Sequence, residues 1–322
     1  MIVSPYSKII LDEAEKFGIK RVPIGENGRM FLLKRGEKFT YIYQSLTELI
    51  SNPAYIIAAN KFLTSQTLKK FGFPVPECKL IRNFQDAADF LRRHKKIVIK
   101  PLSANRGRGI TIGIKTISEL KEALAFARQN TKINPLRKAY ANCVLAERAV
   151  PGDDHRILVI DYRFVFAIKK IPAYVIGDGK SSIFQLIGRK NREKKTHKRK
   201  IIIDESLKHV LSRQGLSLGN IPAAGRQVFV RRTANLSTGG ESIDITEKLN
   251  PSLKAMAIRA ARALKMPVAG FDFMCRDYTE DKGYFIEVNP IPGLMIHHFP
   301  HQGKGRNPAK KIIETLIKSK LL

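Results

Sequence analysis

The chain has 322 residues, of which 43% are hydrophobic and 27% charged, values typical of a soluble globular protein with two or three small lobes. Apolar stretches are short and charged residues begin at Lys8, so we expect no membrane span and no secretory leader, and predict a cytoplasmic protein. Subtracting 28 acidic from 58 basic residues gives a net charge of +30, which attracts polyanions of any kind without choosing among them.

The N-terminal region is too small for a complete nucleotide-binding domain. Residues 1–50 predict an amphipathic helix and then a hairpin within the alternating segment 30–43. A further helix is expected to begin after Asn60, which suits the N-cap position, and to end at Gly72. Its apolar stripe is predicted to consist of Leu63, Leu68 and Phe71.

Two strands joined by a glycine-rich loop follow a helix expected at 84–93. The strands are KIVIKP and ITIGI, and the loop SANRGRG (103–109) lies between them. The glycine loops of Rossmann and P-loop proteins open a helix, whereas this loop joins two strands, which argues against both of those folds. The other elements expected here are a strand in PVPECKLI, a helix at 118–129 and a strand in CVLAERAV.

The second half of the chain is rich in strands. Residues 155–177 show β-branched alternation around a turn at Asp161 and Tyr162. The later elements are expected to be a short helix, a strand in GRQVFVRR, a helix at 252–264, strands in AGFDFMC and GYFIEVN, and an amphipathic helix at 308–321. This order predicts an α+β fold whose catalytic sheet is mainly antiparallel.

One basic run, residues 189–200 (RKNREKKTHKRK), concentrates the positive charge. The run has no aromatic residue and the chain has no Trp, so the platforms on which nucleic-acid bases stack are missing and nucleic-acid binding is not favoured. We expect a solvated loop. The alternative is a site for an acidic acceptor, such as a peptide or polymer bearing Asp or Glu.

Two strands near the C-terminus carry side chains suited to a hard cation. Asp272 lies in AGFDFMC, and Glu287 and Asn289 lie in the next strand. Because strand side chains alternate, Glu287 and Asn289 point to one face, about 7 Å apart. If the strands are neighbours, three oxygen donors converge, which suits Mg²⁺. The alternative is a paired strand carboxylate and an Asn that only forms the turn before Pro290.

Two lysines are candidates for binding phosphate. Lys100 ends a buried strand, where an unpaired ammonium is costly, so it needs an anion, either a nucleotide phosphate or a carboxylate. Lys61 lies 39 positions earlier. The glycine loop that follows Lys100 offers backbone N–H groups that can approach phosphates closely, although any tight hairpin would look similar.

Six segments in this order resemble the ATP-grasp ligases: VIKPLSANRGRGITIGI, LAERAVPGDDHRILVI, PAYVIGDGKSSI, RRTANLSTGGESIDIT, AGFDFMC and FIEVNPIPGLMIHHFPHQGKGR. The chain is most similar in pattern to the ATP-grasp region of cyanophycin synthetases and to the C-terminal half of bifunctional glutathione synthetases, over roughly residues 58–322. The resemblance implies two α+β lobes that clamp ATP after a truncated N-terminal region. It predicts a short N-terminal region, a small lobe with the glycine loop and a large catalytic lobe, at 1–58, 59–146 and 147–322.

The resemblance also implies the residues that hold ATP and its metal ions. They are Lys61 and Lys100 on the phosphates, the loop residues Ser103, Asn105, Gly107, Arg108 and Gly109, the adenine hinge residues Glu147, Arg148 and Val150, and Asp154 on the ribose. Asp272, Glu287 and Asn289 match the metal ligands, with two Mg²⁺ ions expected and Mn²⁺ as the alternative.

Catalytic and substrate-binding residues are implied in the same way. Arg231 is expected to hold the transferring phosphoryl group, with Arg156 assisting from the opposite strand. The expected substrate-binding residues are Asn235, Ser237, Thr238, Gly239, Gly240, Gly293 and His297, which offer amide, hydroxyl and backbone donors or lie just beyond the metal strand. His297 and His298 could also deprotonate the amine.

The chemistry implied is amide formation between amino-acid or peptide substrates through an acyl phosphate, which releases ADP and phosphate. No Ser–His or Cys–His arrangement suggests a nucleophilic side chain, and we expect three inert core thiols, Cys78, Cys143 and Cys275. The resemblance covers neither the Mur-type domain of cyanophycin synthetases nor the γ-glutamyl–cysteine ligase of the glutathione enzymes, so the substrates stay open. Homo-oligomerisation is common in this branch, but the sequence shows no interface signal.

A competing hypothesis is a basic protein that uses the ATP-grasp fold to bind nucleic acid or acidic polymers, with catalysis lost. Such a binder has no need to keep the metal residues together with both lysines. All five are present, so the sequence favours the enzyme.

Overall fold

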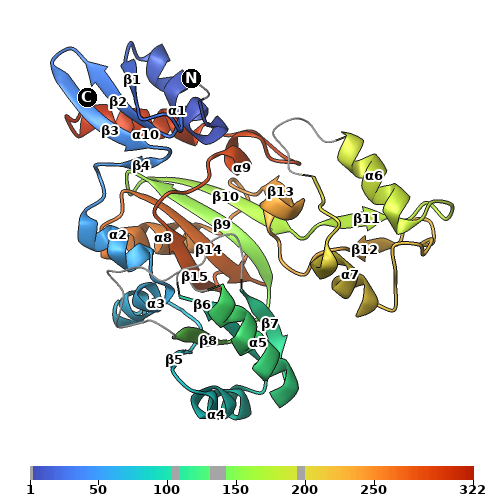
Figure 1. Ribbon diagram of the computed structural model, residues 1–322. Helices are drawn as coiled ribbons and strands as arrows, with labels where there is room; N and C mark the ends of the chain where they lie inside the picture. The colour runs from blue at the N-terminus through green and yellow to red at the C-terminus, as the bar shows by residue number, and fades with distance from the viewer. Residues whose placement is uncertain (1–2, 103–108, 131–142, 194–199) are drawn as a thin grey trace.

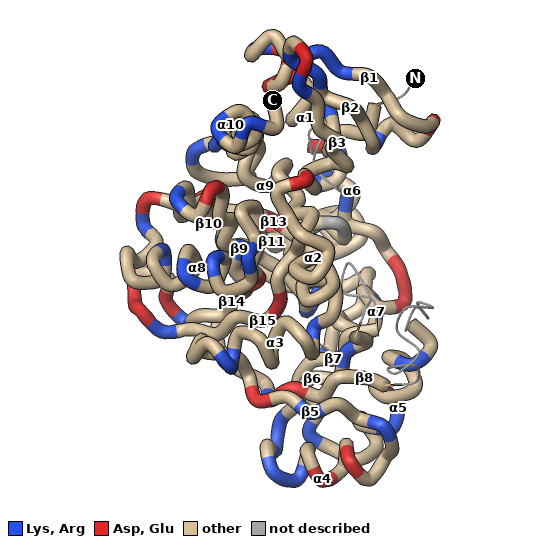
Figure 2. The backbone as a smooth tube through the Cα atoms, turned by 90° about the vertical axis from the view of Figure 1, so that its left-hand side faces the viewer, with Lys and Arg blue, Asp and Glu red and all other residues tan. Residues whose placement is uncertain are grey.

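The computed structural model describes residues 3–102, 109–130, 143–193 and 200–322. Figure 1 shows a central sheet with a unit formed by both chain ends above it, a small lobe below it and an arm projecting to one side. Figure 2 shows Lys and Arg positions along the backbone of all of these parts. Among the described residues, no helix is long and apolar enough to cross a membrane.

The two ends of the chain form one packed body, which we call the terminal unit. It contains helix α1 (Pro5–Lys16), a four-stranded antiparallel sheet in the order β1-β2-β3-β4, and the last helix α10 (Pro308–Lys318). The strands are β1 (Lys20–Ile24), β2 (Met30–Arg35), β3 (Lys38–Tyr43) and β4 (Leu46–Thr47). The predicted hairpin is thus β2–β3, extended by one strand on each side.

Two short helices lead from the terminal unit to the small lobe: α2 (Asn52–Ala58), which the sequence did not predict, and α3 (Lys61–Lys70). The N-cap prediction is confirmed, because the Asn60 side chain accepts hydrogen bonds from the Phe62 and Leu63 amides. Leu68 is buried as expected, but Phe71 is 60% exposed. Phe71 lies at the C-cap with non-helical backbone angles, so the helical periodicity no longer places it on the stripe.

The small lobe is an antiparallel sheet in the order β5-β8-β6-β7, with helices α4 (Phe84–His94) and α5 (Ile117–Gln129) packed on one face. Its strands are β5 (Cys78–Ile81), β6 (Ile97–Pro101), β7 (Thr111–Ile114) and β8 (Val144–Arg148). Strand β8 runs across the domain boundary predicted after residue 146, and the domain division stays a prediction.

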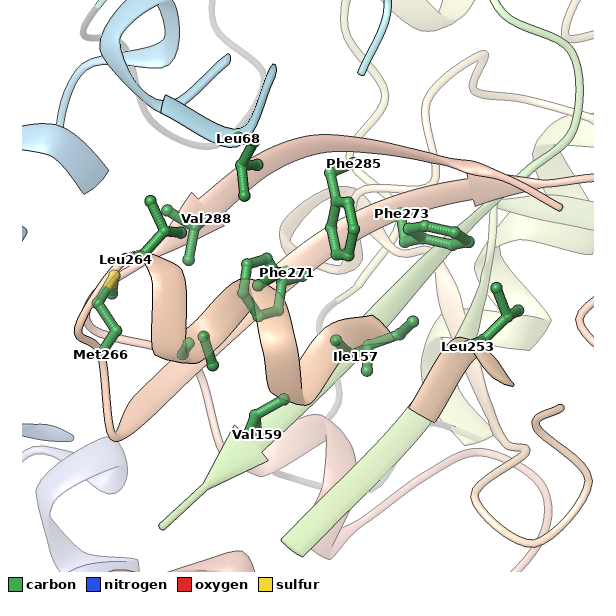
Figure 3. Close-up of a cluster of buried hydrophobic side chains, with 14 of the residues drawn as sticks. Leu68, Ile157, Val159, Leu253, Leu264, Met266, Phe271, Phe273, Phe285 and Val288 are labelled. Carbon is green, nitrogen blue, oxygen red and sulfur yellow. The ribbon is translucent and has the colours of Figure 1, made fainter. Parts of the chain in front are cut away.

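The central sheet has five antiparallel strands in the order β13-β10-β9-β14-β15. Their bounds are β9 (Asp153–Ile160), β10 (Phe164–Ile171), β13 (Glu241–Asp244), β14 (Val268–Cys275) and β15 (Tyr284–Asn289). One face packs on helix α8 (Pro251–Ala263) through a core in which the rings of Phe271, Phe273 and Phe285 contact one another (Figure 3).

The other face of this sheet is divided along the strands. Leu158, Ile160 and Val268 pack into the core of the terminal unit. Because side chains alternate, Asp154 and Arg156 of β9 point to this same face, beyond its apolar end. The terminal unit therefore covers the apolar end of the face and leaves the polar end for a site.

The arm, residues 172–230, has its own small core. It consists of a two-stranded sheet, β11 (Tyr174–Ile176) and β12 (Gln227–Phe229), with helices α6 (Ile183–Glu193) and α7 (Glu205–Ser212). The chain returns to the sheet through a short 3₁₀ turn (Leu236–Thr238), and a last short helix, α9 (Met295–His298), follows β15.

Candidate active site

The candidate metal residues lie on adjacent strands, as the sequence predicted. Asp272 of β14 lies opposite Glu287 of β15, and Gly270 lies opposite Asn289. On its other side Asp272 lies opposite Arg156 of β9. Side chains from three strands therefore converge at one place on the polar end of the sheet.

Arg156 and Lys170 hold Asp272 in a dense ionic cluster. The Arg156 Nη2 and Nε atoms lie 2.7 Å and 2.8 Å from Asp272 Oδ1, and the Lys170 Nζ atom lies 3.0 Å from it. The same Nζ atom lies 2.7 Å from Asp154 Oδ1. Lys170 thus joins the predicted ribose residue to a predicted metal ligand.

Sequence reasoning missed Lys170. The signal that could have found it is the turn at Asp161 and Tyr162, both of which have positive φ angles. That turn fixes the pairing of β9 with β10 and places Lys170 opposite Asp154.

The electrostatics of the cluster separate its two aspartates. Burial alone would raise the pKa of Asp272, but Arg156 and Lys170 outweigh burial and hold that pKa well below its usual range. For Asp154, burial and the neighbouring Asp272 carboxylate outweigh Lys170 and raise the pKa to about 6. Asp272 is therefore the permanently ionised member of the cluster.

Lys61 and Asn289 complete the cluster on the side of β15. The Lys61 Nζ atom, at the start of α3, lies 3.2 Å from Glu287 Oε2. The Asn289 amide nitrogen lies 3.5 Å from Glu287 Oε1 and 3.4 Å from the Gly270 carbonyl. Lys61 therefore pairs with a candidate metal residue, and its contact with phosphate stays a prediction.

Lys100 forms a buried ion pair in the small lobe. Its Nζ atom lies 2.6 Å from Glu147 Oε1, and both side chains are about 95% inaccessible to solvent. The carboxylate alternative considered for Lys100 is thus the contact in this structure, and the partner is a predicted hinge residue. Arg148 lies over the Tyr284 ring, and Val150 is half-buried at the hinge.

The predicted glycine loop lies mostly outside the described residues. This holds for Ser103, Asn105, Gly107 and Arg108. Gly109, the first described residue after them, has a left-handed backbone with φ +72°.

The predicted substrate turn, residues 235–240, is a compact loop between the arm and β13. The Gly240 amide and the Thr238 hydroxyl both donate to the Asn235 carbonyl, at 3.2 Å and 3.0 Å. Gly239 has φ +96°, and a Cβ there would lie 2.6–3.0 Å from atoms of Ile201, so only glycine fits. Ser237 lies within the 3₁₀ turn, and its side chain is outside the described set.

Arg231 does not join the ionic cluster. Its guanidinium donates to both carboxylate oxygens of Asp204, at 2.8 Å and 3.0 Å, and to the Ile202 carbonyl at 2.6 Å. These contacts fix the segment that packs on Gly239. In this structure Arg156 lies in the ionic cluster and Arg231 pairs with Asp204, and the predicted role of each arginine in holding the phosphoryl group stays a prediction.

The segment after β15 brings Gly293 and His297 near the cluster in different ways. Among the described residues, no heavy atom lies within 4 Å of where a Cβ on Gly293 would be, so this turn faces open space. His297 is fully buried, and burial together with nearby Arg156 keeps its pKa well below the usual range. The imidazole is therefore neutral and enclosed, and its predicted role in substrate binding stays a prediction. His298 is turned to the terminal unit, where its Nε2 accepts from the Ala309 amide at 3.5 Å.

Residues 63–229 match the family described as the prokaryotic glutathione synthetase ATP-grasp domain. The chain belongs to the ATP-grasp family. Its ATP-grasp domain is 32% identical over 330 residues to the cyanophycin synthetase of Trichormus variabilis, covering 98% of this chain and 35% of that protein. It is 34% identical over 327 residues to the bifunctional glutathione biosynthesis protein of Clostridium perfringens, covering 97% of this chain and 41% of that protein.

A solved structure supports the same ATP-grasp assignment. The bifunctional glutathione synthetase of Pasteurella multocida superposes with a TM-score of 0.71 at 28% identity, over 98% of this chain and 44% of that chain. The α+β prediction is confirmed. The similarity predicted to start near residue 58 begins earlier, because it covers almost the whole chain. The chain spans between a third and a half of the length of these relatives.

ATP-grasp ligases in general use ATP and Mg²⁺. The residues of this ATP-grasp domain fit the metal: two carboxylates and an amide converge from paired strands, and cations of the chain itself now neutralise the carboxylates. The metal residues lie beyond the matched range 63–229, so their assignment depends on this geometry.

Proposed function

We propose that the chain is an ATP-dependent ligase that joins a carboxylate to an amine, with amino acids or peptides as substrates and ADP and phosphate as products. One observation carries this proposal. Asp272, Glu287 and Asn289 form an oxygen-rich group on adjacent strands, and Arg156, Lys170 and Lys61 surround it with positive charge. Such a site suits the phosphates of ATP with their metal.

In the proposed reaction, an oxygen of the substrate carboxylate attacks the γ-phosphorus of ATP and the bond to ADP breaks. The amine nitrogen then attacks the acyl carbon, loses a proton, and phosphate leaves. Mg²⁺, when bound, supplies Lewis-acid stabilisation of the phosphate oxygens, and Asp272, Glu287 and Asn289 would hold it. We propose two ions, with Mn²⁺ as an alternative.

The chain's own residues orient the phosphates and balance their charge. We infer that Lys61 leaves Glu287 for a phosphate when metal binds, because the metal takes over neutralisation of that carboxylate. Lys100 is proposed to reach a phosphate from the small lobe, and Arg156 to face the transferring group. Residues 235–240 and the open turn at Gly293 are proposed to border the substrates.

The test is ADP release with pools of amino acids and dipeptides, together with the product mass. Glu287→Gln should abolish ADP release because it removes a charged metal ligand, while Asp153→Asn, an exposed change on β9, should leave it unchanged. If Glu287→Gln releases ADP as fast as the parent, the metal assignment is wrong.

The net charge of +30 favours one second candidate, a binding protein for acidic polymers without ligase activity. It predicts that the parent protein releases no ADP with any pool and still binds such polymers. A cytoplasmic location and a homo-oligomeric state remain predictions of the sequence.

A further inference from the structure

Helix α6 has one covered face and one open face. Ile183, Leu186 and Ile187 pack into the core of the arm. On the opposite side the Phe184 ring is 58% exposed, although it is a large apolar side chain. Figure 1 shows α6 in the arm, at the outer edge of the molecule.

A surface cavity of about 310 Å³ lies on this open face. It is lined by Ser181, Phe184, Gln185, Gly188, Arg189 and Arg192. Gly188 makes the notch: a Cβ there would have Arg192 Nη1, at 3.8 Å, as its one neighbour within 4 Å among the described residues. The notch therefore lies between an aromatic ring and a guanidinium, with room for an incoming side chain.

The charge around the cavity selects an anionic partner. Arg189 is held in place by Asp178 Oδ2 at 3.1 Å and by the Ser181 hydroxyl at 3.0 Å. Arg192 also lines the cavity, and none of the residues that line it is acidic. A single-stranded nucleic acid bound by base stacking would use a series of aromatic platforms, whereas this cavity has one ring beside a notch of side-chain size. A peptide that combines carboxylates with an apolar side chain matches both features.

We propose that the open face of α6 is a docking site for an acidic peptide, with an apolar side chain of the peptide in the notch over Gly188 and its carboxylates on Arg189 and Arg192. The role of that peptide as the acceptor of the ligase depends on the proposed function. The binding itself does not, and it can be measured without turnover.

Contacts on the inner side of α6 connect this surface to the candidate substrate turn. The Lys190 Nζ atom lies 2.7 Å from Glu241 Oε1, at the start of β13, and donates to the Tyr174 carbonyl at 2.8 Å. Asn191 bonds both backbone groups of Ile201, accepting from its amide at 2.7 Å and donating to its carbonyl at 2.9 Å.

Ile201 in turn packs directly on Gly239 of the substrate turn. A peptide docked on α6 is therefore held at a fixed position relative to residues 235–240. This geometry would raise the effective concentration of the acceptor end at the site.

The test is the affinity of the full chain for a fluorescein-labelled, glutamate-rich peptide with one central leucine, measured by anisotropy at about 0.15 M salt. Arg192→Glu should weaken binding about tenfold or more by reversing a contact charge. Gly188→Leu should weaken it to a similar extent by filling the notch, and it is compatible with an interior helix position. Replacing the peptide leucine by serine should weaken binding to the parent but not to Gly188→Leu.

Arg259→Glu is the matched control, because Arg259 is an exposed arginine on helix α8, outside the arm. It makes the same charge change and should alter affinity by less than about twofold. Equal losses for Arg192→Glu and Arg259→Glu would mean that the peptide senses only the overall field, and would overturn the site. The site would also be overturned if neither the leucine-to-serine change in the peptide nor Gly188→Leu altered the affinity. It would likewise be overturned if a single-stranded oligonucleotide bound more tightly than the peptide and Gly188→Leu abolished that binding.

The two proposals can fail separately. Loss of ADP release in Glu287→Gln with unchanged peptide affinity supports both. A parent that binds the peptide as expected but never releases ADP contradicts the ligase alone, and a working ligase without notch-dependent binding contradicts the docking site alone.

Discussion

Lys170 lies between two carboxylates, and its side chain is only 9% exposed. Its ammonium offsets charge on both Asp154 and Asp272, which would otherwise repel each other across β9 and β14. A buried ion pair of this kind adds little stability compared with hydrophobic residues in place of all its members. Removing one partner alone lowers the stability strongly, because it leaves a buried charge uncompensated.

We predict that Lys170→Met lowers the free energy of unfolding by about 3 kcal/mol near neutral pH. The loss should shrink as pH falls towards about 6, the pKa of Asp154 in the parent, because without Lys170 the pKa of Asp154 is higher still and its protonation removes one of the opposed charges. Urea unfolding at several pH values measures both effects. Lys169→Met is the control: Lys169 pairs with Asp153 at 2.5 Å, but the two side chains are 30% and 52% exposed. It should cost less than about 1 kcal/mol, and equal losses for the two variants would contradict the argument.

Buried histidines give the molecule a second pH dependence. Burial lowers the pKa of His155 from 6.5 to about 4, lowers that of His298 to about 4, and holds that of His297 well below its usual range. Between about pH 6.5 and pH 4 the unfolded chain therefore binds more protons at these residues than the folded chain does. Stability is lost as pH falls through this window. The raised pKa of Asp154 increases stability as pH falls, but this one residue is outweighed by the three histidines.

We predict that the free energy of unfolding falls between about pH 7 and pH 4.5, and that His155→Gln flattens the fall. The lowered pKa of His155 alone corresponds to a loss of about 3 kcal/mol in the free energy of unfolding at the acid end of the window. Urea unfolding of parent and variant across the window is the measurement. A difference between the two that stays constant with pH would mean that His155 does not titrate on unfolding.

At the scale of elements, the turn between β8 and β9 controls how closely the hinge approaches the end of β14. Gly152 has φ +123°, and a Cβ there would lie 2.4 Å from the Cys275 carbonyl carbon and 2.5 Å from its oxygen. Those neighbours are backbone atoms of a sheet strand and cannot turn aside as a side chain would. Gly18, after α1, also has positive φ, at +70°, but among the described residues nothing lies within 4 Å of its Cβ position.

Gly152→Ala should therefore destabilise the protein by at least about 2 kcal/mol more than Gly18→Ala. Both variants place alanine at positive φ, but +123° is less accessible to alanine than +70°, so their difference combines backbone strain at Gly152 with its close approach to β14. Thermal unfolding of the pair measures it. Similar losses would indicate that the strand end moves away at little cost.

Elements set by local signals could be read from the sequence. Asn60 marked the start of α3, and hydrophobic runs marked β6 and the pair β14–β15. Alternation placed Glu287 and Asn289 on one face, and the pairing of β14 with β15 brought Asp272 to them. These features depend on neighbours in sequence or on one hairpin.

Features set by long-range pairing could not be read in the same way. Lys170 joins the cluster only because of the register between β9 and β10. Arg231 lies outside it and pairs with Asp204, which follows the basic run in the sequence. The spacing of residues along the sequence does not reveal that Lys170 pairs with Asp154 or that Arg231 pairs with Asp204. The resemblance assigned a role to Arg231 from its position in a motif, whereas its contacts come from the arm's own packing.

At the scale of the whole molecule, the two chain ends and the central sheet share one core. Ile10 and Leu11 of α1, together with Ile313 of α10, are buried in the same cluster as Leu158 and Ile160 of β9. The region that the sequence described as a separate N-terminal segment therefore covers the sheet that carries the polar cluster. Because of this shared core, destabilising the terminal unit should destabilise β9 as well.

Ile313→Ala tests this coupling, since Ile313 is fully buried. We predict a loss of about 3 kcal/mol from the cavity it leaves, whereas Lys318→Ala, on the exposed side of α10, should change stability by less than about 0.5 kcal/mol. Thiol labelling reports on the sheet, because Cys275 of β14 is 2% exposed and does not belong to the core of the terminal unit. With Cys78 and Cys143 replaced by alanine, the free energy for exposing Cys275 should fall by the same amount as that for loss of helical circular dichroism. If Ile313→Ala changes the dichroism transition but not the exposure of Cys275, the terminal unit unfolds independently and the shared core does not couple it to the site.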